Sequence, residues 1–167
     1  MNYFLGDPKS IQASIANRAH PLIEVEDIAE GVITYAPQGN DIPISFFVNT
    51  FHPYDAPASV ELICENGRAS LHGEEAEILL ANGKKKTALL DTAAQERFGM
   101  KQYWGVSHIM QIQDFYASLE KGASPVIDGA QGLRTQQLIN GIYDAGKGSG
   151  TLDLSQNLIP ASARQIS

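Results

Sequence analysis

The sequence predicts an α+β fold, in which a large, mainly antiparallel open sheet carries two C-terminal helices on one face. Three observations lead to this prediction. Short runs of alternating, or of β-branched and aromatic, residues fill the first two thirds of the 167-residue chain. Two Asn-Gly pairs punctuate these runs. Two longer segments with apolar residues at three- and four-residue spacing follow them, which is the order typical of an α+β domain.

Four runs have the length of a strand and are too short for an independent helix: residues 10–16, 28–35, 43–51 and 59–65. The pairs Asn66-Gly67 and Asn82-Gly83 favour type I′ turns, because Asn and Gly tolerate the positive φ that such turns need. We therefore expect residues 59–90 to form a run of antiparallel strands. Cys64, the single cysteine, lies in an apolar run and is expected to be a small core residue.

The first helix is expected at residues 106–121, with Ser107 as its N-cap and Gly122 as its C-cap. One stripe of this helix is apolar: Ile109, Ile112, Phe115, Tyr116 and Leu119. The second helix is expected to begin near Asp128 as N-cap and to end at Gly146 and Gly148. Its expected buried side is formed by Leu133, Leu138, Ile139, Ile142 and Tyr143. Residues 151–154 are expected to add a final strand, and residues 155–167 to form a surface extension.

Composition argues against several classes of function. The formal net charge of −7 and the lack of any basic cluster beyond Lys84–Lys86 disfavour a nucleic-acid surface. No apolar run approaches the roughly 20 residues that span a bilayer, and no signal-peptide pattern is present. The four histidines show no metal-ligand spacing, and no nucleophile elbow is found. A lone cysteine fits a reducing, cytoplasmic setting.

The sheet face opposite the helices must pack against another surface. Phe46, Phe47, Val48 and Phe51 cannot all point toward two helices, because neighbouring residues of a strand face opposite ways. An exposed apolar sheet face is typical of an interface, so we expect a homo-oligomer, a partner domain, or both. The sequence does not decide which of Phe46 and Phe47 points outward.

Four ordered segments carry a resemblance to a known family. They are residues 3–13, residues 24–39 with the sequence EVEDIAEGVITYAPQG, residues 55–73, and residues 108–129 with the pattern H-x-x-Q-I-x-D-F … G-x-x-P. Together they resemble the C-terminal domain of the Gfo/Idh/MocA NAD(P)-dependent sugar and polyol oxidoreductases, over about residues 3–154. The resemblance implies a C-terminal domain like that of glyceraldehyde-3-phosphate dehydrogenase, used for substrate binding and oligomerisation, over residues 1–154.

The parts that carry hydride transfer in this family are not found in the sequence. There is no G-x-G-x-x-G, no Glu-Lys-Pro and no D-x-x-x-H. We therefore expect this chain to lack the Rossmann domain, to hold no cofactor or catalytic residue of its own, and to be inactive alone. The resemblance implies that the complete protein uses NAD or NADP on a sugar or polyol.

Four residues are candidates for contact with that substrate. His52 and Tyr54 lie in a Pro-rich loop where turn chemistry requires neither residue, and the equivalent loop lines the sugar pocket in the family. Trp104 and His108 flank the start of the first helix, near a position where the family keeps a histidine. Ordinary packing or helix capping would also explain these residues. Asp27 is expected to satisfy local backbone N–H groups at the start of a strand.

Two other classes of function stay open. In the first alternative, the chain is a stand-alone, non-catalytic module that dimerises or binds a partner through its sheet. A small α+β enzyme with a pocket between sheet and helices is the third alternative.

Overall fold

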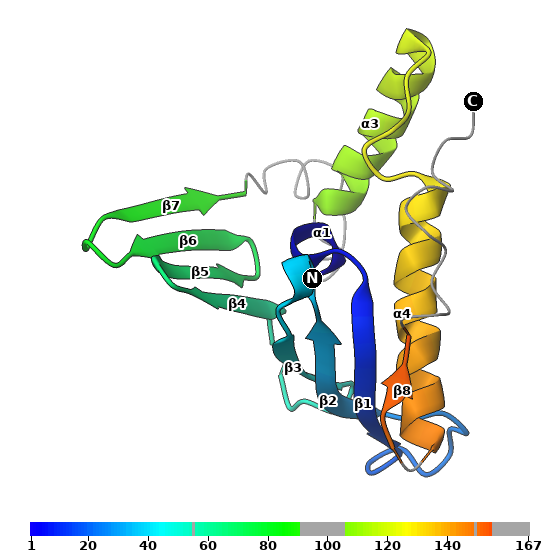
Figure 1. Ribbon diagram of the computed structural model, residues 1–167. Helices are drawn as coiled ribbons and strands as arrows, with labels where there is room; N and C mark the ends of the chain where they lie inside the picture. The colour runs from blue at the N-terminus through cyan, green and yellow to red at the C-terminus, as the bar shows by residue number, and fades with distance from the viewer. Residues whose placement is uncertain (55, 91–105, 149, 155–167) are drawn as a thin grey trace. The chain divides into compact units, whose positions relative to one another are not determined.

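The computed structural model describes residues 1–54, 56–90, 106–148 and 150–154 (Figure 1). They divide into two compact units. The first unit contains residues 1–51 and the segment from residue 127 onward, and the second contains residues 52–126. The predicted extension at 155–167 lies outside the described residues, so the proposed domain boundary at residue 154 stays a prediction.

The first unit is built on a four-stranded antiparallel sheet with the order β3-β2-β1-β8. Its strands are β1 (Pro8–Ala16), β2 (Ile28–Tyr35), β3 (Ile42–Asn49) and the short β8 (Leu152–Asp153). A helical turn, α1 (Asn2–Leu5), precedes β1, and a 3-10 turn (Pro37–Gly39) separates β2 from β3. The strands predicted at residues 10–16, 28–35, 43–51 and 151–154 are confirmed as β1, β2, β3 and β8.

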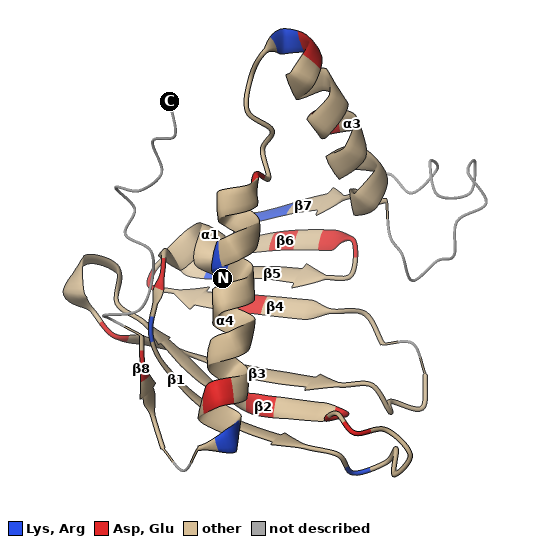
Figure 2. Ribbon diagram, turned by 90° about the vertical axis from the view of Figure 1, so that its right-hand side faces the viewer, with Lys and Arg blue, Asp and Glu red and all other residues tan. Residues whose placement is uncertain are grey.

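One long helix, α4 (Gly129–Lys147), lies over one face of this sheet (Figure 2). The core between helix and sheet is formed by Ile11, Ile33, Tyr35, Ala145 and Leu154. Directly opposed residues share a face, so Ile11, Ile33 and Ile44 form one row toward the helix. The hydroxyl of Tyr35 donates a hydrogen bond to Oδ1 of Asn2 at 2.7 Å, and burial raises the pKa of Tyr35 to about 12.

The buried side of α4 differs in part from the prediction. Leu138 and Ile142 pack against the core, but Leu133 and Ile139 are exposed, and the buried positions are Gly141 and Ala145. Small residues let the helix approach β1 closely. A Cβ atom at position 141 would lie 2.8 Å from Cδ1 of Ile11, so a larger residue would displace the helix or the strand.

The second unit contains a four-stranded antiparallel meander, β4-β5-β6-β7. Its strands are Ser59–Cys64, Gly67–His72, Glu75–Leu80 and Lys85–Leu89 in that order. The α+β class with antiparallel open sheets and two helices is therefore confirmed, and the strands predicted as one large sheet belong to two sheets within the described residues. Cys64 is exposed at the end of β4, next to the hairpin turn, so its predicted core position is wrong.

The two Asn-Gly signals mark hairpins, but the turns are not the predicted type. Cys64 pairs with Gly67, so the two loop residues of the first hairpin are Glu65 and Asn66, and neither has a positive φ. Gly67 takes that conformation instead, with a φ of 151°, and a Cβ there would lie 2.3 Å from the carbonyl oxygen of Leu79. In the second hairpin a three-residue loop ends at Gly83, which has a φ of 80°.

The other helix, α3 (Ser107–Lys121), belongs to the second unit and ends at Gly122 in the left-handed conformation, as predicted. Ser107 is the first helical residue and Val106 is the N-cap, so the predicted capping role of Ser107 is wrong. Four of the five residues of the predicted apolar stripe are exposed: Ile112, Phe115, Tyr116 and Leu119.

Candidate functional site

His52 and Tyr54 lie side by side in the segment between β3 and β4. Their ring centroids are 4.3 Å apart and the rings meet edge to face at 73°. Both residues are exposed, with 68% of Tyr54 accessible to solvent. The pair therefore presents an imidazole and a phenol, which between them donate and accept hydrogen bonds, to solvent at one place on the surface.

Both ends of the loop that carries the pair are fixed by backbone hydrogen bonds. Before the pair, the N–H of Thr50 donates to the carbonyl oxygen of Asp27 at 2.9 Å. After it, the carbonyl oxygen of Ala58 accepts from the N–H of Gly73 at 2.8 Å. Pro53 and Pro57 restrict the backbone between these anchors. The first anchor belongs to the first unit and the second anchor to the second unit, so the His52–Tyr54 pair lies on the segment that joins the two units.

Trp104 lies outside the described residues. His108 lies in the first turn of α3, where it is exposed and has an interaction partner of its own. The structure brings together two of the four predicted residues, and their contact with a substrate stays a prediction.

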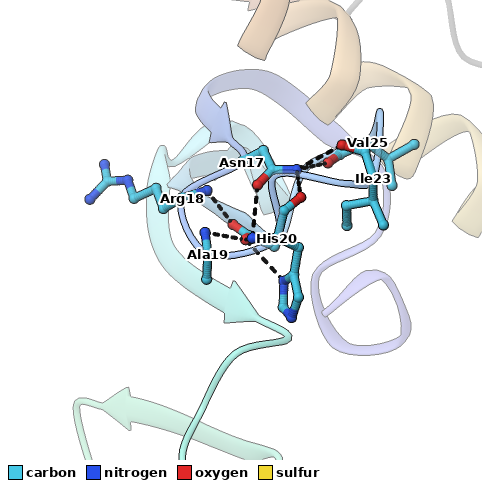
Figure 3. Close-up of polar contacts among 7 residues, drawn as sticks. Asn17, Arg18, Ala19, His20, Ile23 and Val25 are labelled. Carbon is cyan, nitrogen blue, oxygen red and sulfur yellow. Dashed lines mark hydrogen bonds and ion pairs between the residues drawn. The ribbon is translucent and has the colours of Figure 1, made fainter.

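Asp27 is the centre of a polar network whose partners Arg18, Ala19 and His20 are labelled in Figure 3. Its buried carboxylate accepts hydrogen bonds from the backbone N–H groups of Arg18, Ala19 and His20 at 2.8, 2.7 and 3.0 Å. The Nδ1 atom of His20 lies 3.1 Å from Oδ2 of the same carboxylate. The prediction that Asp27 satisfies local backbone groups is confirmed.

The ionisation of Asp27 follows from these partners. Burial alone would raise the pKa of the carboxyl group. The hydrogen bonds from the Arg18 and Ala19 backbone, together with those from His20, favour the charged form and hold the pKa below its usual value. The carboxylate is therefore a stable anion that organises the turn between β1 and β2.

Asn17 completes the same loop and was missed by sequence reasoning. Its Nδ2 group lies 2.8, 3.0 and 3.0 Å from the carbonyl oxygens of His20, Ile23 and Val25, which share its two N–H donors. The loop so fixed displays Leu22, which is 98% exposed. The available signal was an Asn placed directly after a strand, a position where its side chain often bonds to nearby backbone.

An ion pair and a hydrogen bond tie α4 to the segments that precede β1 and β2. Arg134 of α4 pairs with Asp7, with Nε 2.6 Å from Oδ1. The hydroxyl of Tyr143 donates to Oε1 of Glu26, and this bond raises the pKa of Tyr143. These contacts are structural, and sequence periodicity alone gave no sign of them.

The second unit carries its own ion-pair network on one sheet face. Glu77 lies 2.6 Å from Nζ of Lys85, and Arg68 lies between Glu61 and Glu77 at 3.4 and 3.7 Å. The hydrogen bond from Lys85, followed by the charge of Lys85 and Arg68, lowers the pKa of Glu77. All four charges are balanced within the network, so it leaves no net charge for a ligand.

Metal binding and membrane insertion have no support in the described part of the chain. No group of three or more His, Cys, Asp or Glu side chains there has the arrangement of a metal site. Among the helices that the structure describes, none combines the length and apolarity required to cross a bilayer.

Solved oxidoreductases share this fold. An oxidoreductase from Agrobacterium radiobacter, in complex with NAD+, L-tartaric acid and magnesium, superposes with a TM-score of 0.72 at 21% identity. The match covers 94% of this chain and 46% of that protein. The aldose-aldose oxidoreductase from Caulobacter crescentus, complexed with glycerol, gives a TM-score of 0.62 at 19% identity, over 92% of this chain and 43% of that protein.

This chain shares its fold with a part of each of these oxidoreductases. It spans about half the length of the solved proteins that it matches. No protein-family model matches the sequence, and no curated protein resembles it closely enough to count as a match. The resemblance drawn from the sequence is thus supported by structure at the level of the fold.

Proposed function

We propose that this chain is the substrate-binding and oligomerisation domain of an NAD(P)-dependent oxidoreductase that acts on a sugar, a polyol or a related hydroxy compound. The observation that carries the proposal is the near-complete match of this chain to less than half of an oxidoreductase that holds NAD+ and L-tartaric acid. The match to an aldose-aldose oxidoreductase with bound glycerol supports a hydroxyl-rich substrate.

His52 and Tyr54 would contact the substrate in this proposal. A polyol offers hydroxyl groups that both donate and accept hydrogen bonds, and the pair offers complementary groups at one place on the surface. The edge-to-face packing of the rings fixes the orientation of the phenol relative to the imidazole. His108 and Trp104 remain candidates for the same role.

The N-terminus of α4 does not fit a dinucleotide. A pyrophosphate needs free N–H groups at a helix N-terminus. The N-terminus of α4 is already capped by the carboxylate of Asp128, which accepts the N–H of Gln131 at 2.9 Å and would repel phosphate. The glycines from Gly141 to Gly148 lie toward the opposite end of the helix, where the carbonyl groups point. We therefore propose that the cofactor binds outside the described residues. The cytoplasmic location expected from the single cysteine stays a prediction.

The proposal is tested by NMR titration of the isotope-labelled chain with glycerol, L-tartrate, glucose and NAD+ as separate probes. We expect a hydroxy compound to shift the resonances of the loop at residues 50–58, and NAD+ to shift none. Shifts confined to other surfaces, or no shift with any hydroxy compound up to its solubility limit, would instead favour the non-catalytic interaction module. Turnover of any of these compounds by the chain alone would contradict the placement of the cofactor.

A further inference from the structure

The loop that joins β6 to β7 presents an Asn-Gly pair to solvent. Ala81, Asn82 and Gly83 form this loop, and all three are exposed. Gly83 has a φ of 80°, and nothing lies within 4 Å of a Cβ atom built there. In an Asn-Gly pair the backbone nitrogen of the glycine is able to attack the side-chain carbonyl carbon of the asparagine, because glycine has no Cβ atom to obstruct the approach.

One hydrogen bond holds the reacting groups of this pair close together. The N–H of Lys84 donates to Oδ1 of Asn82 at 3.0 Å. This bond closes a turn around the Gly83 nitrogen, which is the atom that must reach Cγ of Asn82. The same N–H polarises the carbonyl group under attack and stabilises the negative charge that develops on Oδ1. The Asn82 side chain is therefore positioned for reaction with its neighbour.

A second hydrogen bond must open before the reaction starts. The N–H of Gly83 donates to the carbonyl oxygen of Leu80 at 2.9 Å, so the Gly83 nitrogen reacts only when the turn has opened. Opening costs little at this place, because the loop is exposed and the strand that follows it, β7, lies at the edge of the described sheet with all of its residues exposed.

Two further Asn-Gly pairs provide internal comparisons, at Asn66 and Asn140. Gly67 begins β5, which pairs with both β4 and β6, and a Cβ atom there would lie 2.3 Å from the carbonyl oxygen of Leu79. Gly141 is buried in α4, where a Cβ atom would lie 2.8 Å from Cδ1 of Ile11. In addition, Oδ1 of Asn140 accepts a hydrogen bond from Nε2 of Gln136 at 3.0 Å. The three pairs therefore share one chemistry but differ in how much structure must open.

We propose that Asn82 is a site of spontaneous deamidation in the folded chain, and that strand pairing and helix packing protect Asn66 and Asn140. The Gly83 nitrogen forms a bond to Cγ of Asn82 and gives its proton to water. The bond from Cγ to the side-chain nitrogen then breaks, ammonia leaves, and a succinimide ring remains. Water opens this ring at either carbonyl carbon, which gives aspartate or isoaspartate at position 82. This site goes beyond the proposed function and does not depend on it.

The two products have different consequences for the hairpin. The aspartate product keeps the turn, because its carboxylate accepts the N–H of Lys84 in a stronger, charge-assisted bond. The isoaspartate product routes the backbone through the side chain and so adds a carbon atom to the loop. That insertion disturbs the pairing of β6 with β7, which includes the ion pair between Glu77 and Lys85. Either product makes the net charge of −7 more negative.

The test is peptide mapping by mass spectrometry after incubation of the full chain in mildly alkaline buffer, with and without concentrated urea. Exchange of NH2 for OH changes the peptide mass, and chromatographic retention separates aspartate from isoaspartate. In urea we expect the three Asn-Gly pairs to react at similar rates. In the folded chain Asn82 should react about tenfold faster or more than Asn66 and Asn140, because their ladder or helix hydrogen bonds must open first.

Two variants test the hydrogen bond that positions the side chain. Lys84→Pro removes the N–H donor and should slow the reaction of Asn82 in the folded chain but not in urea. Lys84→Gln, the matched control, keeps the N–H and removes only the ammonium charge, so it should react at nearly the parent rate. Circular dichroism melting shows whether each variant is folded, and the comparison within the parent chain decides the question if Lys84→Pro is not.

Two results in the parent chain would overturn the proposal. One is a folded chain in which Asn82 reacts no faster than Asn66 or Asn140, and the other is reaction of Asn82 in urea alone. An unchanged rate in a folded Lys84→Pro variant would overturn the role given to the Lys84 N–H. The outcome is separate from the NMR titration, since peptide mapping detects no substrate and the titration detects no deamidation.

Discussion

Gly146 of α4 lies so close to Ile15 of β1 that a Cβ atom at position 146 would be 2.9 Å from both Cγ1 and Cγ2 of that residue. Such a separation is well inside van der Waals contact. The Cγ1 methylene and the Cγ2 methyl are both attached to the branched Cβ of Ile15, so rotation about χ1 cannot move both away at once. The distance between helix and sheet in the first unit therefore depends on the glycine.

We expect Gly146→Ala to destabilise the chain, although alanine is the better helix former. The gain in helix propensity is at most about 1 kcal/mol, whereas overpacking a close contact costs about 1–3 kcal/mol. Gly132→Ala, on the same helix, is the matched control, because nothing lies within 4 Å of a Cβ there. That variant should stabilise the chain by about 0.5–1 kcal/mol. Urea denaturation of both variants measures the difference, and equal stabilisation by the two alanines would contradict the close packing.

The carboxylate of Asp27 should make stability depend on pH in the acid range. The pKa of Asp27 is lowered in the folded chain. The carboxylate therefore adds to the free energy of unfolding at pH values above the pKa of an unfolded Asp, about 3.9. This contribution is lost as the pH falls through the pKa of the folded state. In Asp27→Asn, an NH2 group faces backbone N–H donors that the carboxylate now satisfies. We expect the variant to melt several degrees lower at neutral pH, and to lose less stability than the parent between neutral pH and pH values of about 3.

Asp41→Asn provides the comparison for this measurement. Asp41 pairs with Lys9 at 2.8 Å on the surface, and 55% of its side chain is exposed. Exposed pairs contribute about 0–1 kcal/mol, so this variant should melt close to the parent. Parallel pH profiles for the parent chain and Asp27→Asn would show that the carboxylate has no special role in the loop.

The start of α4 supplies a third prediction. Asp128 lies at the N-cap, in extended conformation, and accepts the N–H of Gln131. Its negative charge also interacts favourably with the positive end of the helix dipole. Asp128→Ala should therefore cost about 1 kcal/mol in the free energy of unfolding, and Asp144→Ala, at an exposed position near the other end of α4, should cost less. A greater loss in Asp144→Ala would be inconsistent with capping as the reason for Asp128.

The sequence predicted those features that depend on neighbours along the chain. The alternation of residues 28–35 defines β2 without error, and Asp128 and Gly122 function as the caps that their types favour. Local signals were less reliable where pairing with a second strand determines which residues form the turn. A positive φ was expected of both Asn66 and Gly67, but of these two Gly67 alone has it. The register of β5 with β4 puts Glu65 and Asn66 in the turn, and Gly67 is the first residue of β5.

The features that the sequence missed depend on contacts far apart in the chain. Leu133 and Ile139 fit a buried stripe by spacing, yet the rotation of α4 is set by how closely Gly141 and Gly146 approach β1. The same holds for the site. Spacing alone placed His52 and Tyr54 on one loop, but the edge-to-face contact of their rings requires coordinates. The choice between Phe46 and Phe47 likewise required the register of β3 against β2: Phe46 packs against the core and Phe47 is exposed.

Tyr54 should contribute to ligand binding without contributing much to stability. The residue is 68% exposed, so Tyr54→Ala removes little buried surface and should leave the melting temperature within a few degrees of the parent. The same change removes the ring that orients His52 and a hydroxyl that bonds to the ligand in the proposed function. We therefore expect the NMR shifts caused by glycerol, L-tartrate or glucose at residues 50–58 to be lost or to need several times more ligand.

Tyr116→Ala is the matched control, because Tyr116 is 62% exposed on α3 and also packs edge to face against an aromatic neighbour, Phe115. Unchanged ligand shifts in Tyr54→Ala, or an equal loss in Tyr116→Ala, would remove the loop from the binding site and leave His108 as the described candidate to test next.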